Sequence, residues 1–211
     1  MKTRERILHQ ALDLFNTHGI AAISSRTISE AIDISYGNLC YHFPQKNDII
    51  YELYLRMQQE QDEQFLQLRS EIMSFDFMAK SLRMLLEIAN KYRFIFIDNT
   101  FIVRNLSKIR RHATAQYHYR RRVLEEIVMF LSEKGYMRTD KVESHNDHII
   151  RSMMIILNSW ITDAEIFFEG KEEDKIEYYL ELLYAVVRPS LTKEGLRALD
   201  QVYQGDEVRK D

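Results

Sequence analysis

Residues that interrupt regular structure are scarce in this chain of 211 residues, which has only two prolines and six glycines. Its apolar residues recur at intervals of three and four instead of alternating, which is the spacing of amphipathic helices. A weak alternation at residues 92–96 has no partner strand, and an isolated strand would leave its backbone groups unpaired. We therefore predict an all-α fold in which this segment is also helical.

The chain has a single cysteine, Cys40, so an intramolecular disulfide is excluded and a structural zinc site is disfavoured. We interpret Cys40 as a small space-filling residue instead of a redox sensor, because no basic residue adjoins it. The first residues are charged throughout and do not form a signal peptide, and no apolar run approaches the roughly 20 residues that span a bilayer. These absences predict a cytoplasmic protein without a membrane partner.

Motifs of catalysis are also missing from the sequence. It contains no glycine-rich phosphate loop, no HExxH, no Gly-x-Ser-x-Gly and no Cys–His pairing, so we predict no enzyme, no catalytic residue and no cofactor. His145 and His148 lie three residues apart beside Glu143 and Asp147, a set that on a helix could bind a metal. They fall at a polar helix start, where acids and histidines are common, and we predict no metal site.

Residues 24–46 have the pattern of two short helices joined by a tight turn. Ser24 and Ser25 are N-cap candidates for the first helix, Ser35 is one for the second, and Pro44 ends the pair. The residues expected to face inward are Ile28, Ala31 and Ile32 on the first helix and Leu39 and Phe43 on the second.

The outer face of the second short helix is unusual for a solvated surface. It carries Tyr36, Gly37, Asn38, Tyr41 and His42, which supply hydrogen-bond donors, acceptors and aromatic edges instead of lysine and glutamate. Such a face suits the second helix of a helix-turn-helix, which reads the DNA major groove. The pattern therefore indicates DNA binding.

The first 55 or so residues resemble the tetracycline-repressor (TetR) family of bacterial regulators. In that family an Ile-Leu-x-x-Ala-Leu-x-Leu-Phe helix and a glycine precede Arg-x-Ile-x-x-Ala, Ser-x-Gly-x-Leu-x-x-x-Phe and a lysine. The matching residues are Ile7-Leu8, Ala11-Leu12, Leu14-Phe15, Gly19, Arg26, Ile28, Ala31, Ser35, Gly37, Leu39, Phe43 and Lys46. At Cys40 the family often has a tyrosine that contacts DNA, so this position departs from the pattern.

The resemblance implies which residues contact DNA. Arg26, Thr27, Tyr36, Asn38 and His42 are expected to reach base edges or backbone, with Arg26 suited to guanine and Asn38 to adenine. His42 has an alternative as a partly packed residue beside Phe43. Gly37 lets the helix approach the groove closely. Phosphate contacts are expected from Ser25, Tyr41 and Lys46.

Two domains are expected, at 1–55 and 56–211. A helix from Lys46 to about Ser70 has a middle, Gln58 to Gln64, that is polar all round, which is typical of a helix bridging two domains. Further helices are predicted at about 75–90, 92–103, 107–134, 144–169 and 172–188, with a short tail at 193–203.

The last two long helices carry an apolar band too broad for one face. The resemblance implies that they meet a second copy in a four-helix dimer interface, whereas burial within the monomer is the alternative. The expected interface residues are Met153, Leu157, Trp160, Tyr179 and Leu183. Such a homodimer would bind a pseudo-palindromic operator on double-stranded DNA, with half-sites about 34 Å apart, and would repress by occupying a promoter.

The resemblance also implies a small-molecule effector. Candidate binding residues in the middle helices are Phe96, Asn99, Tyr117, His118, Asn158 and Asp163, although core packing explains the aromatic residues equally well. Seven cations and no acid lie between Arg104 and Arg122. This basic stretch has three interpretations: a solvated face, a patch near DNA phosphates, or a site for an anionic effector such as an acyl-CoA. The competing function is a helical ligand-binding or adaptor protein that does not bind specific DNA.

Overall fold

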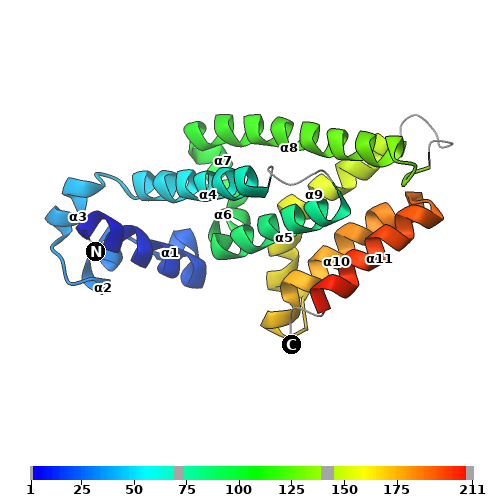
Figure 1. The fold of residues 1–211 in the computed structure, drawn as a ribbon. Coiled ribbons are helices and arrows are strands. Elements are labelled where there is room, and N and C mark those ends of the chain that lie inside the picture. Colours follow the sequence, from blue (N-terminus) through cyan, green and yellow to red (C-terminus); the bar gives the residue numbers. More distant parts are fainter. Residues whose placement is uncertain (1, 69–73, 139–144, 208–211) are drawn as a thin grey trace. The chain divides into compact units, whose positions relative to one another are not determined.

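The computed structural model describes residues 2–68, 74–138 and 145–207, with side chains up to residue 202 (Figure 1). Within these ranges the elements are α-helices and two short 3-10 helices, and one antiparallel bridge joins Met137 to Leu191. The prediction of an all-α fold is confirmed. None of the helices in the described ranges is long and apolar enough to cross a membrane.

The Cα trace divides into two compact units. The first comprises residues 1–62 and 88–115, and the second comprises 63–87 and 116–211. This division differs from the predicted domains 1–55 and 56–211, because residues 88–115 return to pack with the N-terminal helices. Three long helices pass from one unit into the other: α4 (Lys46–Leu68), α5 (Phe75–Lys91) and α8 (Ser107–Glu133).

The first unit also contains α1 (Thr3–Ala22), α2 (Ser25–Ala31), α3 (Tyr36–His42), α6 (Arg93–Ile97) and α7 (Asn99–Asn105). The predicted helix 92–103 is therefore two helices, with Asp98 between them. The second unit adds α9 (His145–Phe167), η1 (Glu172–Asp174), α10 (Lys175–Val187), η2 (Arg188–Ser190) and α11 (Lys193–Glu207).

The hydrophobic core of the first unit is built on α1. This helix buries Ile7, Leu8, Ala11 and Phe15 on one face, and the helix pair that follows contributes Ile28, Leu39 and Phe43. The predicted inward positions on the helix pair are confirmed except for Ala31, which is exposed at the last turn of α2. A small methyl group at a helix end loses little by facing water, so its apolar character is a weak guide to burial.

Contacts on either side of Gly19, where α1 leaves helical geometry, join α1 to α6 and to Asp98, the residue that follows α6. The Asn16 amide donates to the Lys91 carbonyl (2.8 Å) and accepts from the Phe94 N–H (3.1 Å), so it brackets the start of α6. The rings of Phe15 and Phe94 lie 5.3 Å apart beside this amide. At Gly19 the backbone leaves helical geometry (φ 75°, ψ 159°), and the freed Ile20 N–H donates to Asp98 Oδ2 at 3.0 Å.

The polar middle of α4 is not uniformly solvated. Gln58 and Gln61 are buried, together with Tyr54 and Met57 on the preceding turn. At the outer side of the same segment, Glu60 accepts from Lys91 (2.7 Å) and from the Tyr92 hydroxyl (3.1 Å). Burial, followed by the negative charge of Glu60, raises the pKa of Tyr92 to about 12.

In the second unit α9 packs along α10. Trp160 and Tyr179 face each other with ring centroids 5.1 Å apart, and both are almost fully buried. The Tyr179 hydroxyl donates to Asp163 at 2.6 Å. Arg83 on α5 forms a two-pronged ion pair with Glu177 on α10, at 2.8 and 2.7 Å.

The two glycines of the first unit predict opposite effects of substitution by alanine. Gly19→Ala places a side chain at φ 75° and is expected to lower the free energy of unfolding by about 1–3 kcal/mol. Gly37 lies within α3, where an added Cβ meets only Ser35 Oγ at 4.0 Å, so Gly37→Ala is expected to raise it by up to about 1 kcal/mol. Urea denaturation measures both, and equal effects at the two sites would contradict this account.

Candidate nucleic-acid interface

The helix pair at residues 24–43 is held by its caps and its turn. The Thr27 N–H donates to the Ser24 hydroxyl and the Asn38 N–H donates to the Ser35 hydroxyl, each at 3.1 Å, so Ser24 and Ser35 are the caps, whereas the other candidate, Ser25, is the first residue of α2. Asp33 adopts φ 53° in the turn, and the Ile34 N–H donates to the Ser29 carbonyl at 3.0 Å. These bonds satisfy main-chain groups that two seven-residue helices would otherwise leave open.

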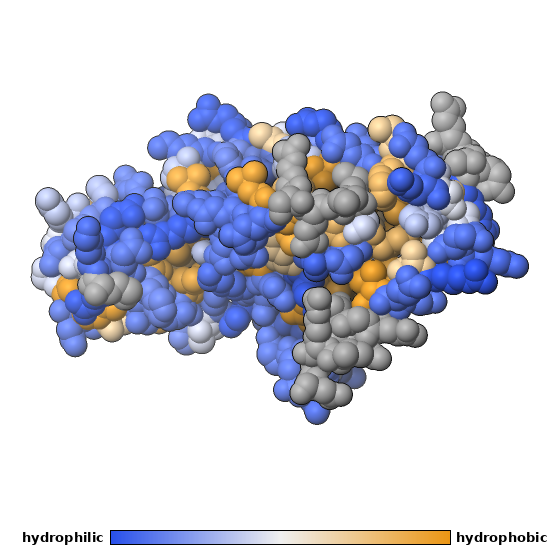
Figure 2. Space-filling model, viewed as in Figure 1, coloured by the Kyte–Doolittle hydropathy of each residue, from blue (hydrophilic) through white to orange (hydrophobic). Residues whose placement is uncertain are grey.

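The outer face of α3 is exposed as predicted. Tyr41 is 83% exposed and Tyr36 is 48% exposed, and Gly37 and Asn38 are exposed beside them. Leu39 and Phe43 on the opposite side are buried, so the helix presents polar groups outward over an apolar base. Figure 2 shows a mainly hydrophilic surface over this part of the chain, with small hydrophobic patches.

Arg26 of α2 lies against Tyr36 of α3. Its guanidinium is 5.7 Å from the centre of the Tyr36 ring, a cation–π geometry that restricts the arginine while leaving its donors exposed. A hydrogen bond with Cys40 raises the pKa of the Tyr36 phenol. Cys40, interpreted from the sequence as a filler, therefore also contacts the tyrosine that supports Arg26.

The other predicted contact residues lie on the same helices. Ser25 is half-exposed at the first position of α2, and the Thr27 hydroxyl is hydrogen-bonded to Ser24 Oγ at 2.8 Å. His42 is half-buried, and its ring packs edge to face with the ring of Tyr41, with the centroids 5.2 Å apart. Eight of the nine predicted DNA-binding residues thus lie on α2 and α3.

Lys46, the ninth residue, points into the protein. Its ammonium donates to the carbonyls of Ile20 and Ile23, each at 2.8 Å, and so closes the end of α1. Burial lowers the pKa of Lys46, and the negative charge of Asp98 opposes this shift. A structural role is therefore sufficient to explain this lysine, and sequence reasoning missed it because both partners lie more than 20 residues away.

The predicted effector residues do not form one group. Phe96 and Asn99 belong to the first unit, and the other four belong to the second. In the second unit Tyr117 accepts from Arg151, while Asn158 donates to the Met154 carbonyl of its own helix at 2.6 Å. His118 is exposed, and Asp163 accepts from Tyr179.

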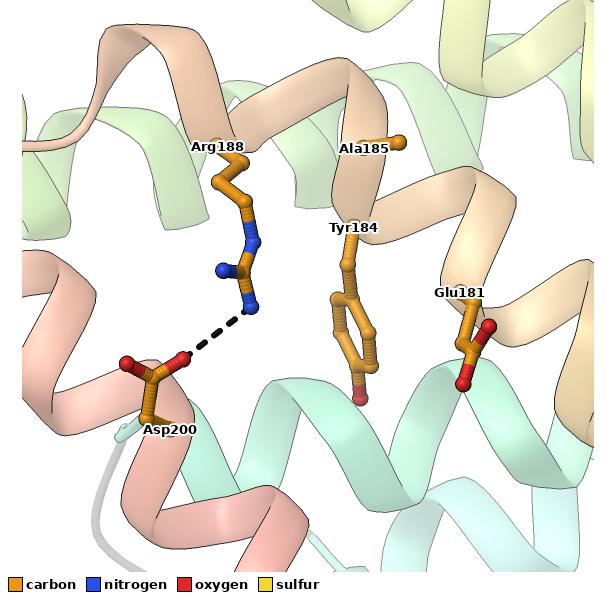
Figure 3. A pocket seen from close by; sticks show the side chains of 5 residues that line it. All are labelled: Glu181, Tyr184, Ala185, Arg188 and Asp200. Carbon is orange, nitrogen blue, oxygen red and sulfur yellow. Dashed lines mark hydrogen bonds and ion pairs between the residues drawn. The ribbon is translucent and has the colours of Figure 1, made fainter.

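A surface pocket of about 330 Å³ lies between α10 and α11 (Figure 3). Glu181, Tyr184, Ala185, Arg188 and Asp200 line it, and Arg188 donates to Asp200 at 3.0 Å across one end. None of the predicted effector residues is in this lining.

The five predicted dimerisation residues are buried within one chain. Met153, Leu157 and Trp160 on α9, and Tyr179 and Leu183 on α10, are at most 6% exposed. Their side chains therefore leave almost no exposed surface on the single chain. The sequence could not separate the two faces, because both are apolar.

The basic stretch is mostly exposed. Lys108 lies 5.5 Å from the centre of the Tyr51 ring, and Arg121 pairs with Glu125 and with Asp147. His145, considered for a metal, is hydrogen-bonded to Ser190 Oγ at 2.7 Å, and Glu143 lies outside the described residues. Among the residues that are described, no group of three His, Cys, Asp or Glu side chains is placed to hold a metal.

The geometry of α1 to α3 defines a helix-turn-helix DNA-binding protein. Residues 7–53 match the family described as "Bacterial regulatory proteins, tetR family", and residues 56–199 match the one described as "Bacterial transcriptional repressor". The chain belongs to the TetR family of transcriptional regulators, which is not a family of enzymes.

Solved structures share this fold. A TetR-family regulator from Marinobacter aquaeolei VT8 is 22% identical with a TM-score of 0.84, covering 97% of this chain and 98% of its own. The ketosteroid regulator KstR2 of Mycobacterium tuberculosis is 17% identical, with a TM-score of 0.68 and coverages of 91% and 96%. A Saccharomonospora viridis regulator in complex with choline is also 17% identical, with a TM-score of 0.70 and coverages of 89% and 96%. No curated protein matches the chain.

The placement of Lys46 gives a direct prediction about stability. Lys46→Met removes both hydrogen bonds to the end of α1 and is expected to lower the free energy of unfolding by about 1–3 kcal/mol. The exposed neighbour supplies the control, since Asn47→Ala is expected to change it by less than about 0.5 kcal/mol. An unchanged urea midpoint, with a weaker salt dependence of DNA binding, would instead make Lys46 a phosphate contact.

Proposed function

We propose that this regulator is a repressor that binds a pseudo-palindromic operator as a homodimer and is controlled by a small molecule. The observation that carries the DNA-reading part is the exposed outer face of α3, with Arg26 held over Tyr36 beside it. An adaptor protein would have no use for such a face. Repression follows if the operator overlaps a promoter, and the site of action is the cytoplasm.

Two kinds of contact are expected at the operator, namely pairing with base edges and further hydrogen bonds to bases or phosphates. Arg26 and Asn38 suit base edges, because a guanidinium pairs with guanine O6 and N7 and a carboxamide pairs with adenine N6 and N7. Ser25, Thr27, Tyr36, Tyr41 and His42 supply further hydrogen-bonding groups for bases or phosphates. Gly37 has no side chain on the outer face of α3, so the helix backbone can approach the groove closely.

Removal of Arg26 tests base reading. We expect Arg26→Ala to weaken binding to an operator obtained by genomic-fragment selection by about 10- to 100-fold and to relax selectivity at one base pair per half-site. Fluorescence anisotropy at two salt concentrations measures this effect. Arg110→Ala removes the same charge from an exposed site in the first unit and serves as the control. Equal losses in both variants would reduce the role of Arg26 to nonspecific attraction.

A second copy is proposed to pack on the outer faces of α9 and α10. On α9, Ile155, Ser159, Thr162 and Ile166 recur at helical spacing, and all four are exposed without a charge among them. On α10 the exposed residues Tyr178, Leu182 and Ala185 follow the same spacing. Because the two helices pack together in one chain, these residues are expected to form neighbouring uncharged strips, in which the large apolar members are Ile155 (54% exposed), Ile166, Tyr178 and Leu182. A self-complementary interface of this kind suits two-fold symmetry.

Introducing a charge into this surface tests the dimer. Leu182→Glu is expected to convert a dimer into a folded monomer at micromolar concentration, because a buried unpaired carboxylate is costly. Light scattering after size exclusion measures the mass, and circular dichroism checks folding. Leu66→Glu places the same charge at an exposed leucine on α4 and is expected to remain dimeric. A monomeric wild type, or a dimeric Leu182→Glu variant, would overturn the assignment of this surface.

Control by a small molecule is supported by the choline complex of the Saccharomonospora viridis regulator, which has the same fold. The identity of that ligand belongs to that protein. For this chain the proposal requires reciprocal coupling, so that an effector that weakens DNA binding is itself bound less tightly by the DNA-bound protein.

A further inference from the structure

The helix-turn-helix itself carries little positive charge for a DNA-binding element. Residues 24–46 contain two cations, Arg26 and Lys46, and two acids, Glu30 and Asp33. The Lys46 ammonium is bound to two carbonyls at the end of α1, which leaves Arg26 to face DNA. Specific DNA binding draws a large share of its affinity from neutralised phosphates. Further cations for the phosphates must therefore come from elsewhere in the first unit.

Several other cations of the first unit are already held by protein groups. Arg4 pairs with Glu52, Arg6 donates to the Ile32 carbonyl, Arg56 pairs with Glu5, and Lys91 pairs with Glu60. Among the described residues of this unit, the exposed cations that neither an acid nor a carbonyl holds are Lys2, Arg26, Arg104, Lys108, Arg110 and Arg111. Four of these six belong to the basic stretch that begins at Arg104.

The start of α8 lies beside the start of α4. The Lys108 ammonium is 5.5 Å from the centre of the Tyr51 ring, and His112 Nδ1 is hydrogen-bonded to the Tyr54 hydroxyl at 3.3 Å. Both pairs advance in the same direction, so the two helices run parallel (Figure 1). Tyr51 comes five residues after the first residue of α4, about 7.5 Å along the helix axis. Because α4 follows α3 in the chain, the basic start of α8 lies toward the recognition-helix end of α4.

Lys108 and Arg111 share one side of α8. Residues three apart on a helix are neighbours on its surface, so Arg111 lies on the side that Lys108 presents beside α4. Arg110 comes two residues after Lys108 and points about 200° around the helix from it. Lys108 and Arg111 are both exposed, and neither pairs with an acid in the described part of the chain. The sequence run of basic residues is thus divided between two sides of the helix.

The acids near this place on α4 do not cancel the two cations. Glu52, which adjoins Tyr51, is paired with Arg4 at 2.9 Å and lies 3.8 Å from Arg56. Asp48, three residues before Tyr51, accepts from the Gln45 N–H at 2.9 Å at the start of the helix. One exposed carboxylate against two exposed cations leaves a net positive surface. A polyanion that approaches the helix-turn-helix is the partner that this charge suits.

We propose that Lys108 and Arg111 form a second phosphate-binding surface, which contacts the operator backbone beside the helix-turn-helix. This inference rests on the proposed operator binding, and it assigns part of the basic stretch to DNA. Phosphate contacts position a protein on the duplex and add affinity, but they do not distinguish one base from another. Arg26 and Asn38 then supply selectivity, while the start of α8 supplies charge.

The test compares two neighbouring arginines of α8. Arg111→Ala is expected to weaken binding to the selected operator about three- to tenfold and to lower the slope of log affinity against log salt concentration by about one, because one phosphate contact is lost. Arg110→Ala removes the same side chain from the other side of the helix and is expected to leave both quantities near their wild-type values. Fluorescence anisotropy of the full-length protein at several salt concentrations measures them, and circular dichroism checks folding.

Two further variants separate a phosphate contact from a structural role. Arg111→Lys keeps the charge and is expected to restore the salt dependence, whereas Lys108→Ala is expected to repeat the effect of Arg111→Ala. The loss is expected to be equal on the operator and on unrelated DNA, since a phosphate contact has no base preference. A loss confined to the operator, or a folded Arg111→Lys variant that stays as weak as Arg111→Ala, overturns the phosphate surface.

Ethylation of single operator phosphates locates the contact directly, because it removes the charge of one phosphate at a time. We expect at least one position in each half-site at which ethylation weakens binding by the wild type but not by Arg111→Ala. Arg110→Ala is expected to keep the wild-type pattern. An unchanged pattern in Arg111→Ala overturns the proposal, since its arginine then touches no phosphate.

Failure of this inference is distinct from failure of the function on which it rests. If the wild type binds its selected operator and Arg111→Ala binds as tightly as Arg110→Ala, the phosphate surface is overturned while operator binding stands. That result leaves the basic stretch to solvent or to an anionic effector. If the wild type shows no sequence-selective binding, the proposed function is overturned and the surface falls with it.

Discussion

The main chain where α1 leaves helical geometry must be hydrogen-bonded, and much of the first unit is arranged around that requirement. The Ile20 N–H, freed at Gly19, donates to Asp98, and the carbonyls of Ile20 and Ile23 accept from the Lys46 ammonium. A buried backbone group without a partner costs about as much as a lost hydrogen bond. One short segment therefore joins α1 to the start of α4 and to the residue that separates α6 from α7.

The packing of the first unit also explains how α3, a helix of only seven residues, holds a defined position. Helices as short as α3 are not stable alone in water. The geometry of α3 therefore comes from the Ser35 cap and from Leu39 and Phe43, which are buried in the hydrophobic core of the first unit. The outer face is then free to carry residues chosen for contact instead of stability. The stacking of Arg26 on Tyr36 likewise restricts a side chain before binding, and a restricted arginine loses less entropy when it binds.

Local features were predictable from the sequence, and tertiary partners were not. The serine caps, the helix periods and the exposed face of α3 depend on neighbouring residues, so the helix-turn-helix and most of the candidate interface followed directly. The inward direction of Lys46 depends on carbonyls 23 and 26 residues away. On α9 and α10 apolar residues occupy both faces, so the sequence could not show which face is buried within the chain. Gln58 is polar and was expected to face solvent, but the fold buries it.

The first unit is discontinuous, because the chain leaves it after residue 62 and returns at residue 88. During synthesis the helix-turn-helix therefore emerges before some of the groups that complete it. The Ile20 N–H and its acceptor Asp98 are separated by 78 residues in the sequence, and Asn16 is separated from the Phe94 N–H by the same distance along the chain. Contacts this distant in sequence form late, since the intervening loop must close first. A nascent chain that ends before α6 thus carries the recognition helix and Lys46, but it lacks Asp98 and Phe94, which bind Ile20 and Asn16 of α1.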